Sequence, residues 1–266
     1  MTNGVLMIPS ERLLDRELAE MLADPRVANL KELSLHNNAL TAESGRLIAD
    51  SPKLAGIQIL DLSFNPIGDE GAAALANSEL LQSVRNLSLA RIGVSGRTAR
   101  ALATSSQAAS IAELDLRYQP LGPDAALLIG KREVLRLTKT GIDAATAVAL
   151  LRAAEVRTLE LSENPIGRLT DLDAIAPAIM NLDLNHCELT DISALAQASA
   201  PALEALELDY NPLGDAGVVA LAEARWLQQL KSLSVVGTKG SPAARQALRS
   251  AWGQRPGLTI DADHAK

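Results

Sequence analysis

The sequence predicts an α/β solenoid in which short strand–helix units stack into a horseshoe, with a parallel sheet on the concave face and helices on the convex face. The stretch from Leu60 to Ser78, LDLSFNPIGDEGAAALANS, joins a strand-like alternation at Leu60 and Leu62 to an alanine-rich run with helical spacing. Similar stretches recur along the chain. Since one such unit is too small to bury its own apolar face, the copies must stack.

The first apolar residue of each motif gives the period. It is 27 residues up to Ile111, then 21, 24, 23 and 24, and again 27 between the last two starts. The nine starts are Leu30, Ile57, Val84, Ile111, Arg132, Val156, Ile179, Leu203 and Leu230. We therefore expect one domain over 1–266, with nine repeats over 30–254 and a partial repeat and frayed tail over 255–266. Residues 1–29 form a degenerate first repeat, whose helix runs from about Ser10, its N-cap, to Ala23.

The shorter periods predict shorter outer elements. We expect less regular convex segments in the units that start at Arg132, Val156 and Ile179, and a local change of curvature there. Trp226 and Trp252 are predicted to pack into the carboxy-terminal end, where a terminal repeat must shield the core.

Turn residues support the same frame. Asn-Pro follows the strand at Asn65, Asn164 and Asn211, as is typical of a turn. Gly-Asp precedes a helix at Asp69 and Asp215, and each aspartate is predicted to cap that helix. A buried asparagine ladder is expected to bond the backbone of neighbouring turns. Its members are Asn38, Asn65, Asn164 and Asn211, with Cys187 as a small substitute, and it should break at Ile92, Gln119, Thr140 and Thr238.

With these motifs the chain resembles leucine-rich repeat proteins, and its long units resemble the ribonuclease-inhibitor-like class. The segments GDEGAAALA at 68–76 and GDAGVVALA at 214–222 are similar to repeats of bacterial proteins, including the effectors named for a G-A-L-A motif. The resemblance implies a horseshoe whose usual work is protein–protein recognition.

The overall composition limits the kinds of partner and the cellular compartment that we expect. The net charge of −7 and pI near 5.1 argue against nonspecific nucleic-acid binding, which needs a basic surface. Cys187 is alone, so no intramolecular disulfide can form. No signal-peptide pattern and no long apolar run is found, so we expect no membrane contact. We expect a cytoplasmic protein, or a secreted effector delivered without a cleavable signal peptide.

Two columns of residues are predicted to line the concave face, because alternate residues of a strand share a face. The central column is half acidic, and three of its acids, Glu160, Asp183 and Glu207, fall on consecutive strands, where like charges repel. The second column holds three of the five Phe, Tyr and Trp residues, and exposed aromatics are typical hot spots. The central column reads Met7, Ser34, Asp61, Ser88, Asp115, Arg136, Glu160, Asp183, Glu207 and Ser234.

The predicted partner-binding residues are Asp61, Phe64, Asp115, Arg117, Tyr118, Arg136, Glu160, Asp183, His186, Glu207, Asp209 and Tyr210. A protein with a basic segment would bind the acidic end, and an acidic segment could bind a basic strip of Arg91, Arg117, Arg136 and Lys139. The alternative is a hydrated polar face whose arginines pair with Glu113, Asp115 and Glu160. Oligomeric state is left open.

Catalytic, metal and cofactor sites are not predicted. The chain has no P-loop, no dinucleotide fingerprint, no HExxH and no paired CxxC, and His36 and His186 fall on distant repeats. The sequence thus favours a non-catalytic protein-binding module. The alternatives are a GTPase-activating or other enzyme-regulating repeat protein, with Arg91, Arg117 and Arg136 as candidates, and the recognition part of a bacterial effector or ubiquitin-ligase assembly.

Overall fold

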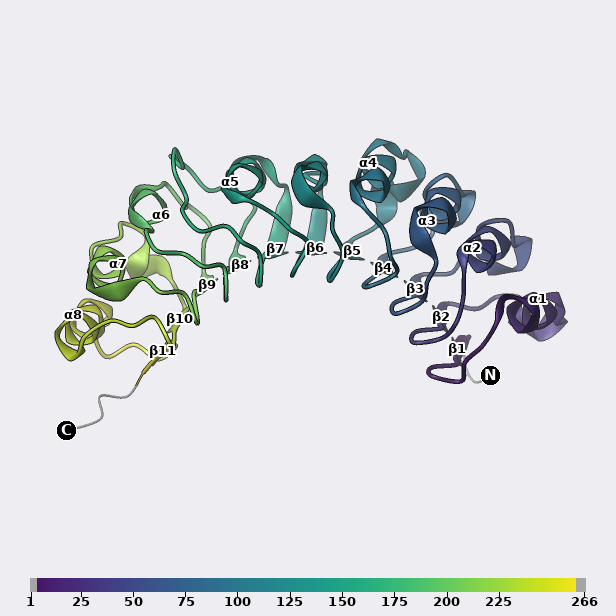
Figure 1. Cartoon of the computed structure of the whole chain (residues 1–266), viewed down its shortest axis with the longest axis horizontal. Helices are drawn as coiled ribbons and strands as arrows, with labels where there is room; N and C mark the ends of the chain where they lie inside the picture. The colour runs from purple at the N-terminus through teal and green to yellow at the C-terminus, as the bar shows by residue number, and fades with distance from the viewer. Residues whose placement is uncertain (1–3, 262–266) are drawn as a thin grey trace. The chain divides into compact units, whose positions relative to one another are not determined.

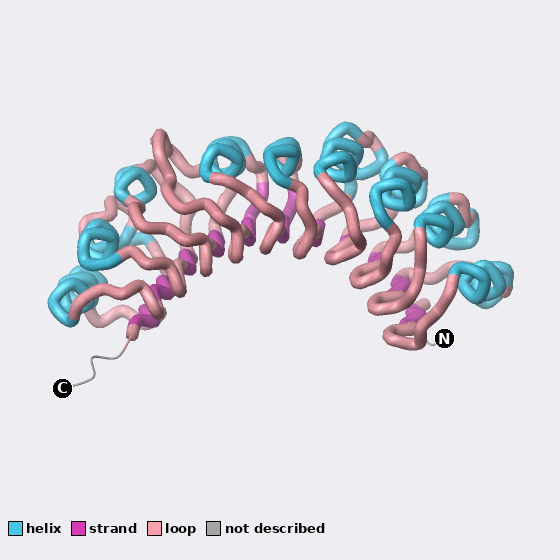
Figure 2. The backbone as a smooth tube through the Cα atoms, in the orientation of Figure 1, coloured by secondary structure: helices cyan, strands magenta, loops and turns pink. Residues whose placement is uncertain are grey.

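A computed structural model describes residues 4–261. The chain divides into two compact units, Met1–Thr140 and Gly141–Lys266, here called unit 1 and unit 2. Within each unit, parallel strands in chain order form one layer and most helices form the other (Figure 1, Figure 2). The predicted α/β solenoid fold is confirmed. That the whole chain is one domain stays a prediction.

Unit 1 holds six strands, and their central leucines stand side by side in the sheet. They are β1 (Val5–Met7), β2 (Glu32–Ser34), β3 (Ile59–Asp61), β4 (Asn86–Ser88), β5 (Glu113–Asp115) and β6 (Arg132–Arg136). Its α-helices are α1 (Asp15–Ala23), α2 (Ala42–Ala49), α3 (Gly68–Ala76) and α4 (Gly96–Thr104). The 3-10 segments are η1 (Pro25–Val27), η2 (Pro52–Leu54), η3 (Glu79–Gln82), η4 (Gln107–Ser110) and η5 (Gly122–Leu127).

The described part of unit 2 holds five strands, and their leucines again stand opposite each other. They are β7 (Val156–Glu160), β8 (Asn181–Asp183), β9 (Ala205–Glu207), β10 (Ser232–Val235) and β11 (Leu258–Ile260). Its helices are α5 (Ala144–Ala153), α6 (Ser193–Gln197), α7 (Gly214–Ala222) and α8 (Pro242–Trp252), with the 3-10 segment η6 (Leu227–Gln229). Of the described residues, no helix is both long and apolar enough to cross a membrane.

The core of each unit is the stack of motif leucines. Leu60, Leu62 and Ile57 are fully buried, and their counterparts in neighbouring repeats are buried in the same way. Each such side chain contributes roughly 1.5–3 kcal/mol by leaving water. Small residues let the helices approach, since a Cβ on Gly45 of α2 would lie 2.6 Å from Cα of Gly71 in α3.

The asparagine ladder forms as predicted at Asn65. Its Oδ1 accepts bonds from the N–H groups of Asn38 and Leu40 at 3.1 Å, while Nδ2 donates to the carbonyls of Leu35 and Leu62 at 2.9 Å. One predicted break is wrong. Gln119 accepts from Ile92 and Val94 and donates to Leu89, because its longer side chain reaches the same backbone groups.

The predicted aspartate caps are also wrong. Asp69 lies inside α3 and accepts bonds from the backbone N–H and hydroxyl of Ser95 and from the hydroxyl of Thr98, all in the next repeat. Asp215 likewise accepts hydrogen bonds from the backbone N–H and the hydroxyl of Ser241. These aspartates therefore connect consecutive repeats. At the amino end, α1 begins at Asp15 and not near Ser10, which has a left-handed backbone with φ 62°.

The predicted shortening of the outer elements is right for two of the three repeats. The repeat that starts at Val156 has no helix before β8, and the next has only the five-residue α6. The repeat that starts at Arg132 instead carries α5, of ten residues. The shortest repeat begins at Ile111, where a 3-10 segment replaces the α-helix, because the 21-residue period follows that start.

The carboxy-terminal tryptophans are buried as predicted, each 2% exposed. The indole of Trp226 donates to the carbonyl of Leu195 and that of Trp252 to the carbonyl of Arg255. Asp261, expected to be frayed, accepts bonds from the N–H of Gly237. The rest of the predicted tail, 262–266, lies outside the described residues.

Candidate functional site

The central column forms within each unit as the sequence predicts. In unit 1 the register places Met7, Ser34, Asp61, Ser88, Asp115 and Arg136 side by side. In unit 2 it places Glu160, Asp183, Glu207 and Ser234 side by side. Whether these side chains bind a partner stays a prediction.

The second column has an unusual backbone. Every member has φ between 50° and 68°, the left-handed region that favours glycine. The predicted members are Asn37, Phe64, Arg91, Tyr118 and Lys139 in unit 1, and Glu163, His186 and Tyr210 in unit 2, and the same backbone conformation extends the column to Ser10 and Gly237. This conformation costs an ordinary residue about 1–2 kcal/mol, so these side chains are kept at some expense in stability. We call these ten positions the rim column.

Two rim side chains in unit 2 form an exposed aromatic pair. The rings of His186 and Tyr210 stack with centroids 4.5 Å apart and planes 18° apart. Tyr210 is 56% exposed. Gly237 follows in the column, and a Cβ there would lie 2.7 Å from Cδ1 of Tyr210. The glycine thus leaves room for the ring, and the pair is held in place while open to solvent.

Asn185, next to His186 in the chain, ties together three acidic residues of neighbouring strands. Its side chain donates to Glu207 at 2.7 Å, and its Oδ1 accepts the N–H of Asp209 at 2.6 Å. Its own N–H donates to Asp183 at 2.8 Å. Asp209 is fixed further by bonds from the hydroxyl of Ser234 and the N–H of Val236, both 2.7 Å. Asn185 is not among the predicted residues, because a lone asparagine outside the ladder carries no pattern.

The acidic face is here defined as Glu160, Asp183, Glu207 and Asp209 with the His186–Tyr210 pair. Burial raises the pKa of Asp183, and the nearby charges of Glu207 and Asp209 raise it further, against hydrogen bonds from Asn185 and Ser162. The ionised form of Asp183 is therefore disfavoured in the folded chain. A cation placed beside it would relieve that cost.

In unit 1 the predicted acids and arginines are largely engaged with each other. Asp115 is only 6% exposed and binds the guanidinium of Arg117 at 2.7 Å, so it serves inside the fold and offers a partner little surface. Arg136 pairs with Glu113 at 3.2 Å. The predicted internal pairing of these arginines is confirmed for both.

The aromatic residues of unit 1 lie beside arginines. The guanidinium of Arg91 is 5.8 Å from the ring centroid of Phe64, and that of Arg117 is 6.0 Å from that of Tyr118. Both rings remain accessible, at 42% and 39%. Aromatic and cationic side chains thus alternate along this part of the rim column.

One group of unit 1 resembles a hydrolase triad in composition but not in geometry. Nδ1 of His36 is 3.1 Å from Oγ of Ser34 and 3.6 Å from Oδ2 of Asp61. A Ser–His–Asp relay needs the serine and the aspartate on opposite ring nitrogens. Here both meet the same nitrogen, so the arrangement cannot pass a proton from serine through the ring to aspartate.

The structure gives little support to thiol or metal chemistry. Cys187 points inward as predicted and is fully buried, which raises the pKa of its thiol to about 12 and disfavours the reactive thiolate. Within the described ranges, no group of three or more His, Cys, Asp or Glu side chains could hold a metal ion.

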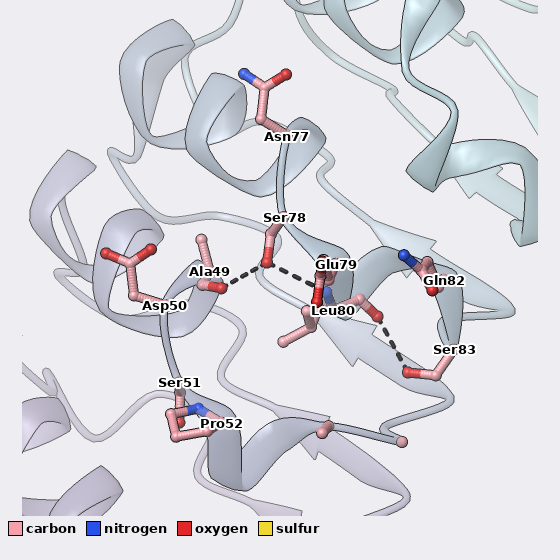
Figure 3. Close-up of a pocket in the computed structure, with 12 residues that line it drawn as sticks. Ala49, Asp50, Ser51, Pro52, Asn77, Ser78, Glu79, Leu80, Gln82 and Ser83 are labelled. Carbon is pink, nitrogen blue, oxygen red and sulfur yellow. Dashed lines mark hydrogen bonds between the residues drawn. The ribbon is translucent and has the colours of Figure 1, made fainter.

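A large open groove, of about 680 Å³, lies away from both predicted columns. It is formed by the ends of α2 and α3 and by the adjoining 3-10 segments, and Ser78 donates across it to the carbonyl of Ala49 (Figure 3). Asp50 and Glu79 are the charged residues among those that line it. None of the predicted binding residues contributes to it.

Comparison with known proteins agrees with the repeat geometry. A family model described as Leucine Rich repeat matches residues 57–76 and 200–222. No curated protein matches the chain by sequence.

Solved structures show distant similarity. The chain is similar to the yeast Rad7 and Elc1 complex, at 16% identity over 93% of this chain and 71% of that chain, with a TM-score of 0.47. A leucine-rich repeat protein of Leptospira interrogans is 18% identical over 92% of this chain and 80% of that chain, with a TM-score of 0.34. The plant peptide hormone receptor RGFR1, in complex with RGF2, is 15% identical over 87% of this chain and 47% of that chain, with a TM-score of 0.35. These similarities carry no information on what this chain binds.

The fold defines a class, a solenoid in which each unit repeats a strand, a turn and an outer segment. The matched segments belong to the same unit that recurs through both halves of the chain. At these two segments the chain is similar to leucine-rich repeats.

Proposed function

We propose that the chain is a non-catalytic protein-binding module and that the acidic face of unit 2 is its main contact surface. Leucine-rich repeats are commonly protein-interaction modules, which supports the general role. The observation that carries the specific proposal is the exposed His186–Tyr210 pair, fixed next to carboxylates that are themselves fixed. Rigid aromatic side chains beside charged groups are the usual composition of a binding hot spot.

Charge indicates the kind of partner. The central and rim columns of unit 2 contain acids at Glu160, Glu163, Asp183 and Glu207, with Asp209 one column over, and neither column contains a lysine or arginine. Unit 2 as a whole has 16 Asp and Glu against 10 Lys and Arg, a net charge of −6. The proposed partner is therefore a protein with a basic segment. Such binding should weaken as salt screens the charges.

The test is affinity capture from the source lysate at low and high salt. The acidic-face variant Glu160→Gln, Asp183→Asn, Glu207→Gln and a separate Tyr210→Ala variant are compared with wild type. The control carries Glu79→Gln, Glu155→Gln and Glu223→Gln, three exposed acids outside the acidic face. A protein retained by wild type and control, but lost from both test variants and at high salt, is the expected result. Equal retention by all variants, once circular dichroism shows that they fold, would reject the acidic face.

A second candidate, regulation of an enzyme such as a GTPase, is favoured by one observation. Arg91 is exposed and, within the described part of the chain, lies over Phe64 without a carboxylate partner, whereas Arg117 and Arg136 bind Asp115 and Glu113. Arg91 is thus the arginine best placed to reach a partner's active site. Stimulated GTP hydrolysis that Arg91→Ala abolishes and Arg97→Ala preserves would support this role in place of passive binding.

A further inference from the structure

The strand face of unit 1 contains a hollow of about 250 Å³ over β3, β4 and β5. We infer that it receives one lysine or arginine side chain of a bound protein. The side chains that line it include Ile59, Asp61, Asn86, Ser88, Glu113 and Arg136. The hollow belongs to unit 1 and shares no residue with the acidic face, so either proposal can fail without the other.

The hollow exists because β4 carries short side chains between longer ones. Asn86 stands between Ile59 and Glu113 in the register, and Ser88 stands between Asp61 and Asp115. The hydroxyl of Ser88 is held at 2.5 Å from that of Ser63, which keeps it out of the opening. The depression is therefore a product of the side-chain sequence and not of a gap between strands.

One wall of the hollow is apolar. Ile59 is 38% exposed, although its neighbours along the same column, Glu32 and Asn86, are polar. An exposed isoleucine contributes little to the core, but it can cover the methylene stem of a long side chain. Lysine and arginine place such stems on apolar surface while their charged ends stay among polar groups.

The opposite part of the hollow is suited to a cation. Asp61, Glu113 and Asp115 line it together with Arg136. Arg136 pairs with Glu113, and Arg117 pairs with Asp115. Asp61 is therefore the acid of the hollow that no guanidinium neutralises among the described residues. Asp61 is 30% exposed and Glu113 36%, so both can still reach a ligand. The charge therefore favours a positive occupant over a negative one.

Asn86 supplies an available acceptor at the centre. Among the described residues its side-chain amide has no hydrogen-bond partner, although the side chain is half-buried. A lysine ammonium has three N–H donors and an arginine guanidinium has five. Asp61, Glu113 and Oδ1 of Asn86 together provide the acceptors that either head group requires.

The test is a methyl NMR titration of the full chain labelled at isoleucine δ1, with Ile59 as the reporter inside the hollow. The probes are the N-acetyl amides of lysine, arginine, norleucine and glutamate. We expect a saturable shift of the Ile59 signal with the lysine or arginine compound, and none with norleucine or glutamate. Norleucine matches the lysine stem without its charge, so it separates apolar contact from recognition of the cation.

Variants make the outcome decisive. Asp61→Asn should weaken the binding of the cationic probe about three- to fivefold, as expected for a partly exposed ion pair. Asn86→Ala should also weaken it, whereas Glu207→Gln on the acidic face should leave it unchanged. An equal shift with norleucine, a shift with glutamate, or no saturable shift with either cationic probe would overturn the inference. The Ile59 signal itself reports whether each variant is folded.

Discussion

Unit 1 and unit 2 are built from one repeat, yet their strand faces are chemically different. Unit 1 is nearly neutral, with 16 Asp and Glu against 15 Lys and Arg, and its arginines bind its acids or cover its aromatic rings. Unit 2 has the same number of acids but only 10 basic residues, and its aromatic pair is flanked by carboxylates. The same repeat therefore presents two kinds of strand face. In unit 1 the acidic charges are balanced by nearby arginines, and in unit 2 they are not. An uncompensated face costs stability by itself and is the better candidate for binding.

The largest expected effect comes from the ladder and tests whether the two units unfold separately. Asn65→Ala would leave three backbone groups of unit 1 unpaired, since the carbonyl of Leu35 keeps its bond from Asn38. Asn211→Ala would leave four unpaired in unit 2. Each should cost about 3–5 kcal/mol of unfolding free energy. Hydrogen exchange should locate the loss in the mutated unit. If either variant weakens protection equally across the whole chain, the units fold as one cooperative domain, as the sequence predicted.

The next effect is a gain of stability. Arg132 stands at a position that is Leu, Ile or Val in the other full repeats, its Nε is buried without a partner, and burial lowers the pKa of its guanidinium. Arg132→Leu should raise the unfolding free energy by about 1–3 kcal/mol, since it removes a desolvated donor and restores an apolar contact. Urea unfolding measures the change, with Arg12→Leu at an exposed site as the control. A loss of stability would show that its bond to the carbonyl of Ile111 is worth more than the burial costs.

Gly237→Ala should disturb the aromatic pair directly. The added Cβ would meet the ring of Tyr210 at 2.7 Å, and the backbone has φ 68°. We expect a loss of about 1–2 kcal/mol and weaker binding at the acidic face. In the double variant Gly237→Ala, Tyr210→Ala the steric part of this loss should disappear. Strict additivity of the two single changes in urea unfolding would contradict the contact.

The smallest effect concerns the cost of the uncompensated charges. The raised pKa of Asp183 means that its stabilising contribution is complete below the unfolded pKa and is lost as pH rises through the folded value. Asp183→Asn should therefore stabilise the chain at neutral pH, by about 0.5–1 kcal/mol as for a like-charge cross-strand pair, and not in acid. Urea unfolding at both pH values measures this. The control is Asp171→Asn, which removes one carboxylate at an exposed site of unit 2.

The sequence predicted what depends on repetition. The period located the strands, and the alternation within each motif placed Asp61, Asp183 and Glu207 in one column with the right neighbours. Leucines in a stacked core can satisfy their packing in only one register, so the pattern determines the face.

What depends on contacts between repeats could not be predicted in the same way. Gln119 takes the place of an asparagine because of its reach, Asp69 bonds the following repeat instead of its own helix, and Asn185 joins two acids from different strands. Asp115 is in the predicted column, but Arg117 covers it. The contacts of Gln119, Asp69 and Asn185 join residues about 20–30 apart in the sequence, which no local pattern reports. Arg117, in contrast, is two residues from Asp115, and their pairing could be predicted.

The rim column has a consequence for how such a protein can change its specificity. At all ten positions the chain makes the same left-handed turn, whether the residue is Phe64, Lys139, Glu163 or Gly237. Because the fold demands only this turn, one non-glycine side chain can replace another at similar conformational cost at the nine rim positions other than Gly237. These nine positions are therefore the part of each repeat where the residue type can vary on an unchanged backbone. A library randomised only at these nine positions should keep its melting temperature while its choice of ligands diverges.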